Sequence, residues 1–125
     1  MRQNAQSGAE ANQWGRRTAR SIARRIDAVP VADGRSNEFA RDGRLITIRC
    51  ARRDTTSVGV SYKMLDRVDA VIAAFETNDG AFELYEMSPS LYKLFLRDSK
   101  GKNQVGLVSK TYFVRFDRNF QTIHL

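Results

Sequence analysis

A two-residue turn signal, Asp42-Gly43, constrains the fold of this chain more than any other feature of its sequence. The segments on either side of it, residues 36–41 and 44–51, alternate between polar and apolar side chains as half-buried strands do. Asp-Gly between two such segments is typical of a β-hairpin with a tight two-residue turn. We therefore predict that these two segments pair as neighbouring antiparallel strands.

The predicted hairpin brings three polar side chains to one face of its two strands. A two-residue turn places Glu38 directly opposite Thr47, and Arg49 follows on the same face because strand side chains alternate. The other face carries residues that we expect in the core, namely Phe39, Ile46, Ile48 and Cys50. An acid, a hydroxyl and a guanidinium are thus expected to share one face of a half-buried sheet.

The rest of the chain alternates between helix-like and strand-like segments. The longest predicted helix covers residues 13–27, with Asn12 as a candidate N-cap and residues 1–12 as a flexible tail. Further strands are predicted at residues 29–31, 57–60, 70–76, 81–87, 105–108 and 120–125, and shorter helices at 62–68, 88–96 and 109–116. This pattern predicts a single α/β or α+β domain over residues 13–125, with a mixed sheet of about five strands flanked by helices.

The charge of the chain is distributed very unevenly. Residues 1–53 hold twelve arginines, no lysine and five acids, which accounts for the whole net charge of +7. The planar guanidinium group donates paired hydrogen bonds to phosphate oxygens. The asymmetry therefore predicts a polyanionic partner, and we expect nucleic acid, in particular double-stranded DNA.

Four of these arginines gather on one side of the predicted helix at residues 13–27. At 100° per residue, Ile22 and Ile26 lie on its apolar face. The arginines lie away from that face, at Arg16, Arg17, Arg20 and Arg24. No acid lies between Glu10 and Asp27. We interpret this cluster as a phosphate-binding face; the alternative is an ordinary solvated surface.

Other cations extend the expected nucleic-acid-binding surface. They lie at the hairpin tip, after the second hairpin strand and in the polar loop at residues 98–104, at Arg41, Arg44, Arg52, Arg53, Lys100 and Lys102. Such contacts give affinity that depends on salt and not on base sequence. The residues therefore predict a binding surface but no preference for particular bases.

Length, cysteine content and hydropathy limit the number of domains, the cellular location and the partners that we expect for the chain. A chain of 125 residues is long enough for one domain with a stable core. The single Cys50 cannot form an internal disulfide, and we find neither a secretory signal nor an apolar stretch of membrane-spanning length. We expect a cytoplasmic protein without a membrane partner, in which the aromatic C-terminal third offers a surface for a homodimer.

Three segments together resemble the PD-(D/E)xK, or restriction-endonuclease-like, superfamily: "WGRRTARSIARRI", "NEFARDGRLITIRCAR" and "GVSYKMLDRVDAVIAAF". Over residues 14–75 the order helix, strand, strand, strand, helix, strand is similar to the core of that family. The hairpin resembles the active-site pattern of that family, in which an acid on one strand is followed by acid-x-lysine on the next strand. The resemblance implies a role in DNA processing, such as restriction, defence or repair.

The family's active-site residues are matched only in part. Glu38 stands at the first acid, Thr47 stands where the second acid belongs, and Arg49 stands where the lysine belongs. Such nucleases hold Mg²⁺ with two carboxylates, whereas a threonine offers a neutral oxygen and an arginine only donates. The resemblance therefore implies a nuclease-like scaffold with an unorthodox catalytic site, in which Glu38 is the candidate metal ligand.

Three functions remain open from the sequence. The first is a DNA-binding protein with a nuclease-like scaffold, which needs no cofactor. The second is an Mg²⁺-dependent endonuclease or nickase that uses Glu38, and the third is a small interaction subunit of a larger nucleic-acid complex. An ion pair between Glu38 and Arg49 would explain the polar cluster without any of these functions.

Overall fold

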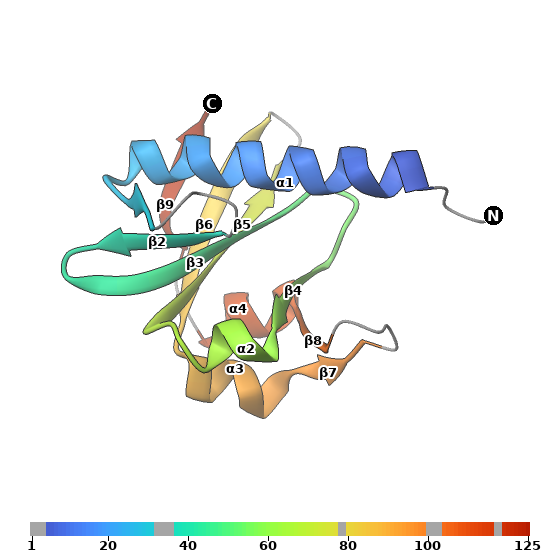
Figure 1. Ribbon diagram of the computed structural model, residues 1–125, viewed down its shortest axis with the longest axis vertical. Helices are drawn as coiled ribbons and strands as arrows, with labels where there is room; N and C mark the ends of the chain where they lie inside the picture. Colours follow the sequence, from blue (N-terminus) through green and yellow to red (C-terminus); the bar gives the residue numbers. More distant parts are fainter. Residues whose placement is uncertain (1–4, 32–36, 78–79, 100–103, 117–118) are drawn as a thin grey trace.

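The structure is a computed structural model that describes residues 5–31, 37–77, 80–99, 104–116 and 119–125. It is built in layers around one mixed β-sheet, as Figure 1 shows. A long helix crosses one face of this sheet, and a small second sheet with three short helices covers the other face. The predicted α+β domain with a mixed sheet is therefore confirmed.

The described chain alternates between strands and helices. The elements, in order, are α1 (Ala5–Arg25), β1 (Val29–Pro30), β2 (Glu38–Arg41), β3 (Arg44–Ala51), β4 (Ser57–Ser61), α2 (Tyr62–Leu65), β5 (Ala70–Glu76), β6 (Ala81–Met87), α3 (Pro89–Phe95), β7 (Arg97–Asp98), β8 (Val105–Ser109), α4 (Lys110–Phe116) and β9 (Asn119–His124).

The central sheet has the strand order β1-β2-β3-β5-β6-β9. Strands β3 and β5 are parallel, with Ile46 opposite Ala70, and the chain passes from one to the other through β4 and α2. Two parallel strands start at the same edge of a sheet. The turn that precedes β5 therefore lies near the start of β3.

The β2–β3 hairpin has the predicted turn and register. Asp42 and Gly43 have φ values of 53° and 75°, the left-handed conformations that a tight hairpin turn requires. The register pairs Glu38 with Thr47. The turn thus fixes which side chains of both strands face each layer.

The first core lies between α1 and the central sheet. Ile22 of α1 and Ile46, Ile48 and Ile72 of the sheet are completely buried there. Burial of one such side chain is worth about 1.5–3 kcal/mol. The apolar face of α1 is therefore firmly attached to the sheet, and its opposite face is left to solvent.

The second core lies between the other face of the central sheet and the antiparallel sheet β4-β8-β7. Tyr92 of α3 is fully buried in it, and its hydroxyl donates to the carbonyl oxygens of Gly106 (2.7 Å) and Val58 (3.1 Å). The ring of Phe113 packs edge-on against both Tyr92 and Phe75. This polar anchor and the aromatic contacts hold the second layer in place.

The structure differs from the sequence prediction in two respects. The first helix begins at Ala5, so residues 5–12 are helical where we expected a flexible tail, and Asn12 lies inside the helix instead of capping it. The alanine, glutamine and glutamate residues of this segment favour helix. The central sheet has six strands, and β4 pairs with β8 in a separate sheet because Val58 and Val60 cover the second core.

Candidate nucleic-acid interface and polar cluster

The solvent face of α1 carries the predicted group of four arginines, which we call the α1 arginine face. All four side chains are exposed, whereas Ala19 and Ile22 of the same helix are completely buried. Its members are Arg16, Arg17, Arg20 and Arg24. From first to last they span about 12 Å of helix axis, at 1.5 Å per residue. The helix thus presents several cations along a short, rigid line.

Two further arginines lie along α1. The guanidinium of Arg52 lies 4.1 Å from the ring centre of Trp14, whose ring packs 6.3 Å from that of Phe82. Arg25 donates from Nη1 to the carbonyl oxygen of His124 over 2.7 Å. The structure thus packs Trp14 against the first core, and the contact between Arg52 and Trp14 had no signal in the sequence.

The arginines at the hairpin tip are bound by other parts of the protein. Arg41 donates from Nε to the carbonyl oxygen of Ile26, 2.9 Å away, just beyond the end of α1. Arg44 lies 2.8 Å from the Glu86 carboxylate of β6, and this hydrogen-bonded anion raises the pKa of Arg44. Both side chains therefore anchor the hairpin as well as adding charge.

Three predicted phosphate-binding residues remain, namely Arg53, Lys100 and Lys102. Arg53 is exposed after β3, and its backbone N–H donates to a carboxylate oxygen of Glu76 over 3.2 Å. Lys100 and Lys102 lie outside the described residues. Their expected role stays a prediction.

Glu38, Thr47 and Arg49 lie on the face of the hairpin that points away from α1. Leu45 and Ala51, which share their face of β3, pack in the second core, while Ile46 and Ile48 pack under α1. Thr47 is completely buried and Glu38 is 9% exposed. The alternation of β3 thus groups the three predicted site residues, on the opposite side of the sheet from the α1 arginine face.

A fourth member of this group, Arg67, was missed by the sequence analysis. Its Nη2 atom donates to Oε1 of Glu38 over 2.9 Å. Arg67 comes from the turn before β5, which the parallel pairing of β3 and β5 brings to Glu38. The alternative ion pair between Glu38 and Arg49 does not form between these two described side chains. We call Glu38, Thr47, Arg49 and Arg67 the polar cluster.

Burial changes the acid–base properties of the groups around Arg49. Desolvation lowers the pKa of Arg49, because burial disfavours its cation, and it raises the pKa of the Tyr92 hydroxyl. Burial also raises the pKa of Cys50 to about 12. The thiol is therefore protonated at neutral pH, which agrees with its predicted role as a small core side chain.

The polar cluster does not fit a divalent metal. Mg²⁺ is bound through carboxylates and other oxygen ligands, but Glu38 is the only carboxylate of the cluster and already contacts Arg67. No group of three or more His, Cys, Asp or Glu residues placed to hold a metal occurs in the described ranges. The hydroxyl of Thr47 is buried and has no hydrogen-bond partner among the described atoms. The polar cluster therefore lacks the second carboxylate of the active-site pattern that the hairpin resembles, and its one carboxylate is held by Arg67.

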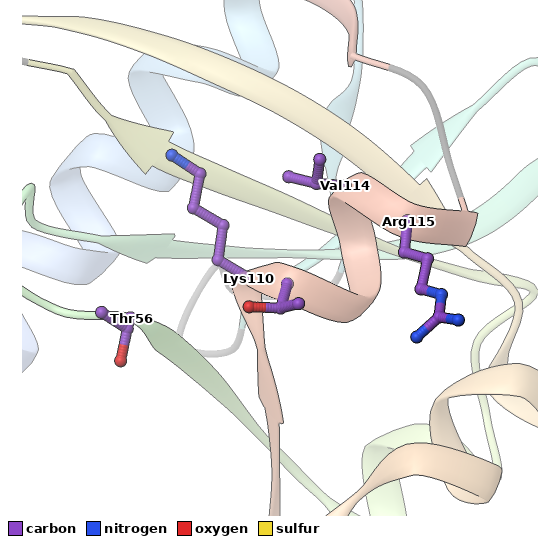
Figure 2. A pocket seen from close by; sticks show the side chains of 5 residues that line it. Thr56, Lys110, Val114 and Arg115 are labelled. Carbon is purple, nitrogen blue, oxygen red and sulfur yellow. The ribbon is translucent and has the colours of Figure 1, made fainter.

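A hollow elsewhere on the surface lies between Thr56 and α4 and is lined by Lys110, Thr111, Val114 and Arg115. Figure 2 shows the amine of Lys110 and the guanidinium of Arg115 pointing to opposite sides of it. Lys110 lies 3.6 Å from Glu83, and Arg115 lies over the ring of Phe116. Because its charged groups diverge, the hollow does not present a site for one charged ligand.

The C-terminal third also exposes aromatic side chains, as expected. The ring of Phe95 stacks on Tyr112 and Phe116, with centroids 4.6 Å and 4.7 Å apart. Leu94 beside Phe95 is 73% exposed. The surface of α3 and α4 therefore combines ring stacking with exposed apolar area.

No protein-family model matches this chain, and no curated protein matches it. Among solved structures it is similar to Hjc of Archaeoglobus fulgidus, a Holliday junction resolvase from an archaeal hyperthermophile, with a TM-score of 0.49 and 9% sequence identity. The similarity covers 85% of this chain and 91% of that one. We carry neither a family nor a residue role over from this similarity.

None of the described helices is both long enough and apolar enough to cross a membrane.

Proposed function

We propose that this protein binds nucleic acid, in particular double-stranded DNA, through the α1 arginine face. The observation that carries the proposal is the exposure of four arginines on one rigid helix whose other side is buried in the core. The resemblance to restriction-endonuclease-like proteins supports DNA processing or defence as the setting. Exposed cations on a preformed helix contact phosphates without a folding step.

The expected binding is electrostatic and independent of base sequence. Guanidinium groups that contact phosphates release condensed counterions, so the logarithm of the affinity falls linearly with the logarithm of the salt concentration. Four contacts correspond to a slope of about −3.6, at about −0.9 for each contact on duplex DNA. Arg52 lies along the same helix and is expected to add to this slope.

Fluorescence anisotropy with a labelled duplex over a range of salt concentrations tests the proposal. The wild-type protein is expected to show the steep slope, and a variant with Arg16, Arg17, Arg20 and Arg24 changed to Gln is expected to lose most of it. Lys63→Gln/Lys93→Gln/Arg97→Gln/Arg115→Gln, which removes four exposed cations on the other side of the sheet, is the matched control. Circular dichroism checks that each variant is folded. Equal slopes for both variants would refute the proposal.

A metal-dependent endonuclease or nickase is the second candidate function. The position of Glu38 opposite Thr47 on the hairpin supports it, and the contact of Glu38 with Arg67 speaks against it. Conversion of supercoiled plasmid to nicked circles with Mg²⁺ or Mn²⁺, abolished by Glu38→Ala, would establish this activity. Absence of cutting at high protein concentration with either metal would remove it.

A role as an interaction subunit, or as a homodimer, is supported by the exposed aromatic surface of α3 and α4. Sedimentation velocity over a range of protein concentrations measures self-association directly. If this surface forms the contact, Phe116→Ser is expected to shift the distribution toward monomer. A wild-type chain that is purely monomeric would exclude the homodimer. Only the role as an interaction subunit that binds a different protein would then remain for this surface.

A further inference from the structure

The polar cluster carries an imbalance of charge, and one of its two cations is mostly buried, where charge is costly. Two guanidinium groups, of Arg49 and Arg67, stand against one carboxylate, of Glu38. Arg49 makes no hydrogen bond or ion pair to another side chain in the described part of the sequence, and it is mostly buried. A buried cation without a partner is strongly destabilising unless an anion accompanies it.

The buried hydroxyl of Thr47 is a second, independent sign of a missing ligand. Its Oγ1 atom has no accessible surface and no hydrogen-bond partner among the described atoms. Thr47 and Arg49 are two residues apart on the same face of β3, which places their Cα atoms about 7 Å apart. Their side chains lie on the same face of one strand, where a guanidinium and a hydroxyl donor are able to contact a single tetrahedral anion, directly or through one water.

We propose that the polar cluster binds a phosphate group without a metal ion. The positive charge that a divalent cation supplies in metal-dependent nucleases is supplied here by Arg49. Arg49 contacts the anion from within the sheet, and Arg67 neutralises Glu38 so that the carboxylate does not repel the phosphate. The hydroxyl of Tyr92 takes no part, because it already donates to two carbonyl oxygens.

The solvent reaches this site from the side of Arg67. The Arg67 side chain is 54% exposed and that of Glu38 is 12% exposed. Arg49 is partly exposed, and Thr47 is completely buried. A terminal phosphate of a nucleic-acid strand and free inorganic phosphate both have the required chemistry. This site lies across the sheet from the α1 arginine face, so the proposal stands independently of the function proposed above.

Isothermal titration calorimetry of the full chain with inorganic phosphate, in EDTA, tests the proposal. Arg49→Gln is expected to lower the affinity about tenfold or more, the effect of losing a charge-assisted hydrogen bond. Arg115→Gln and Lys63→Gln are the controls and are expected to bind phosphate as the wild type does. Addition of Mg²⁺ is expected to leave the affinity unchanged. A 5′-phosphorylated oligonucleotide that binds more tightly than its 5′-hydroxyl form, with the difference lost in Arg49→Gln, identifies a strand end as the source.

Thermal unfolding separates this role from a merely structural one. In phosphate-free buffer, Arg49→Gln is expected to raise the melting temperature by roughly 3 °C, because it removes a buried cation that lacks a partner. Phosphate is expected to raise the melting temperature of the wild type but not that of the variant. No phosphate binding by the wild type, binding that requires Mg²⁺, or a variant that melts lower without phosphate would each overturn the proposal.

Discussion

The two faces of the central sheet present arginine in contrasting surroundings. On the α1 side, the side chains of the α1 arginine face stand in solvent on a regular helix. On the other side, Arg49 is mostly buried and Arg67 contacts Glu38. Exposed cations cost little and bind any nearby polyanion, whereas a buried cation costs much and is selective for one ligand geometry. We therefore propose that one residue type serves both a broad binding surface and a small, specific cluster in the same domain.

The largest expected difference between the two faces is in DNA affinity. Reversing two charges on α1, in Arg17→Glu/Arg24→Glu, is expected to weaken duplex binding about a hundredfold at moderate salt. The same reversal on the opposite side, in Lys63→Glu/Arg115→Glu, is expected to change it less than about threefold. Fluorescence anisotropy under identical conditions measures both. Equal losses would mean that overall charge, and not a particular face, determines binding.

The second prediction concerns how the layers are held together. Tyr92→Phe removes the hydroxyl that donates to Val58 and Gly106, leaving buried carbonyl oxygens without this partner. We expect it to lower the free energy of unfolding by about 1–3 kcal/mol, measured by urea denaturation. Tyr112→Phe, which changes an exposed ring of α4, is the control and is expected to have almost no effect. A neutral Tyr92→Phe would show that apolar contacts alone hold the second layer.

The third prediction follows from the raised pKa of Cys50, about 12 in the folded protein. The thiol of the unfolded chain ionises near pH 8.5, so the unfolded state loses this proton first as the pH rises. The contribution of this thiol to the free energy of unfolding is therefore fully present below about pH 8.5. It declines as the pH rises toward 12, at up to about 1.4 kcal/mol per pH unit. Urea denaturation at several alkaline pH values is expected to show a smaller decline in Cys50→Ala than in the wild type. Rapid alkylation of the folded thiol at pH 8 would contradict this account.

The smallest effect is expected at the hairpin tip. Glu86→Gln removes the carboxylate that holds Arg44, an exposed pair whose loss is expected to cost less than about 1 kcal/mol. Arg44 is then free to meet a phosphate, so duplex affinity is expected to rise about twofold and the salt slope to steepen slightly. Glu83→Gln, which removes a carboxylate near Lys110, is the control. A fall in duplex affinity would show that the ion pair orients Arg44 for binding.

Much of the fold was predictable because local signals determined it. Asp42-Gly43 gave the hairpin register, and alternation along β3 gave the two faces on which Ile48 and Arg49 lie. The pairing of β4 with β8 was not predictable in this way, since it joins segments more than forty residues apart. Such non-local partners depend on which apolar faces remain uncovered after the main sheet forms.

The polar cluster was predicted only in part for the same reason. Glu38, Thr47 and Arg49 follow from one hairpin, whereas Arg67 reaches Glu38 only because β3 and β5 are parallel. A prediction that β3 and β5 are parallel would have been enough to find it, because the connection between parallel strands returns the chain to the edge where β3 begins. The contact between Arg52 and Trp14 depends on packing between distant segments and had no such signal.

The Asp42-Gly43 turn also limits which insertions and deletions the two hairpin strands tolerate during evolution. Each strand of the hairpin carries its apolar and its charged residues in alternation, so one inserted or deleted residue within a strand would exchange the two sets. Ile46 and Ile48 would then leave the space beneath α1, and Glu38 or Arg49 would enter it. Descendants of this sequence are therefore expected to vary in side-chain chemistry at these positions while the lengths of the two strands stay constant.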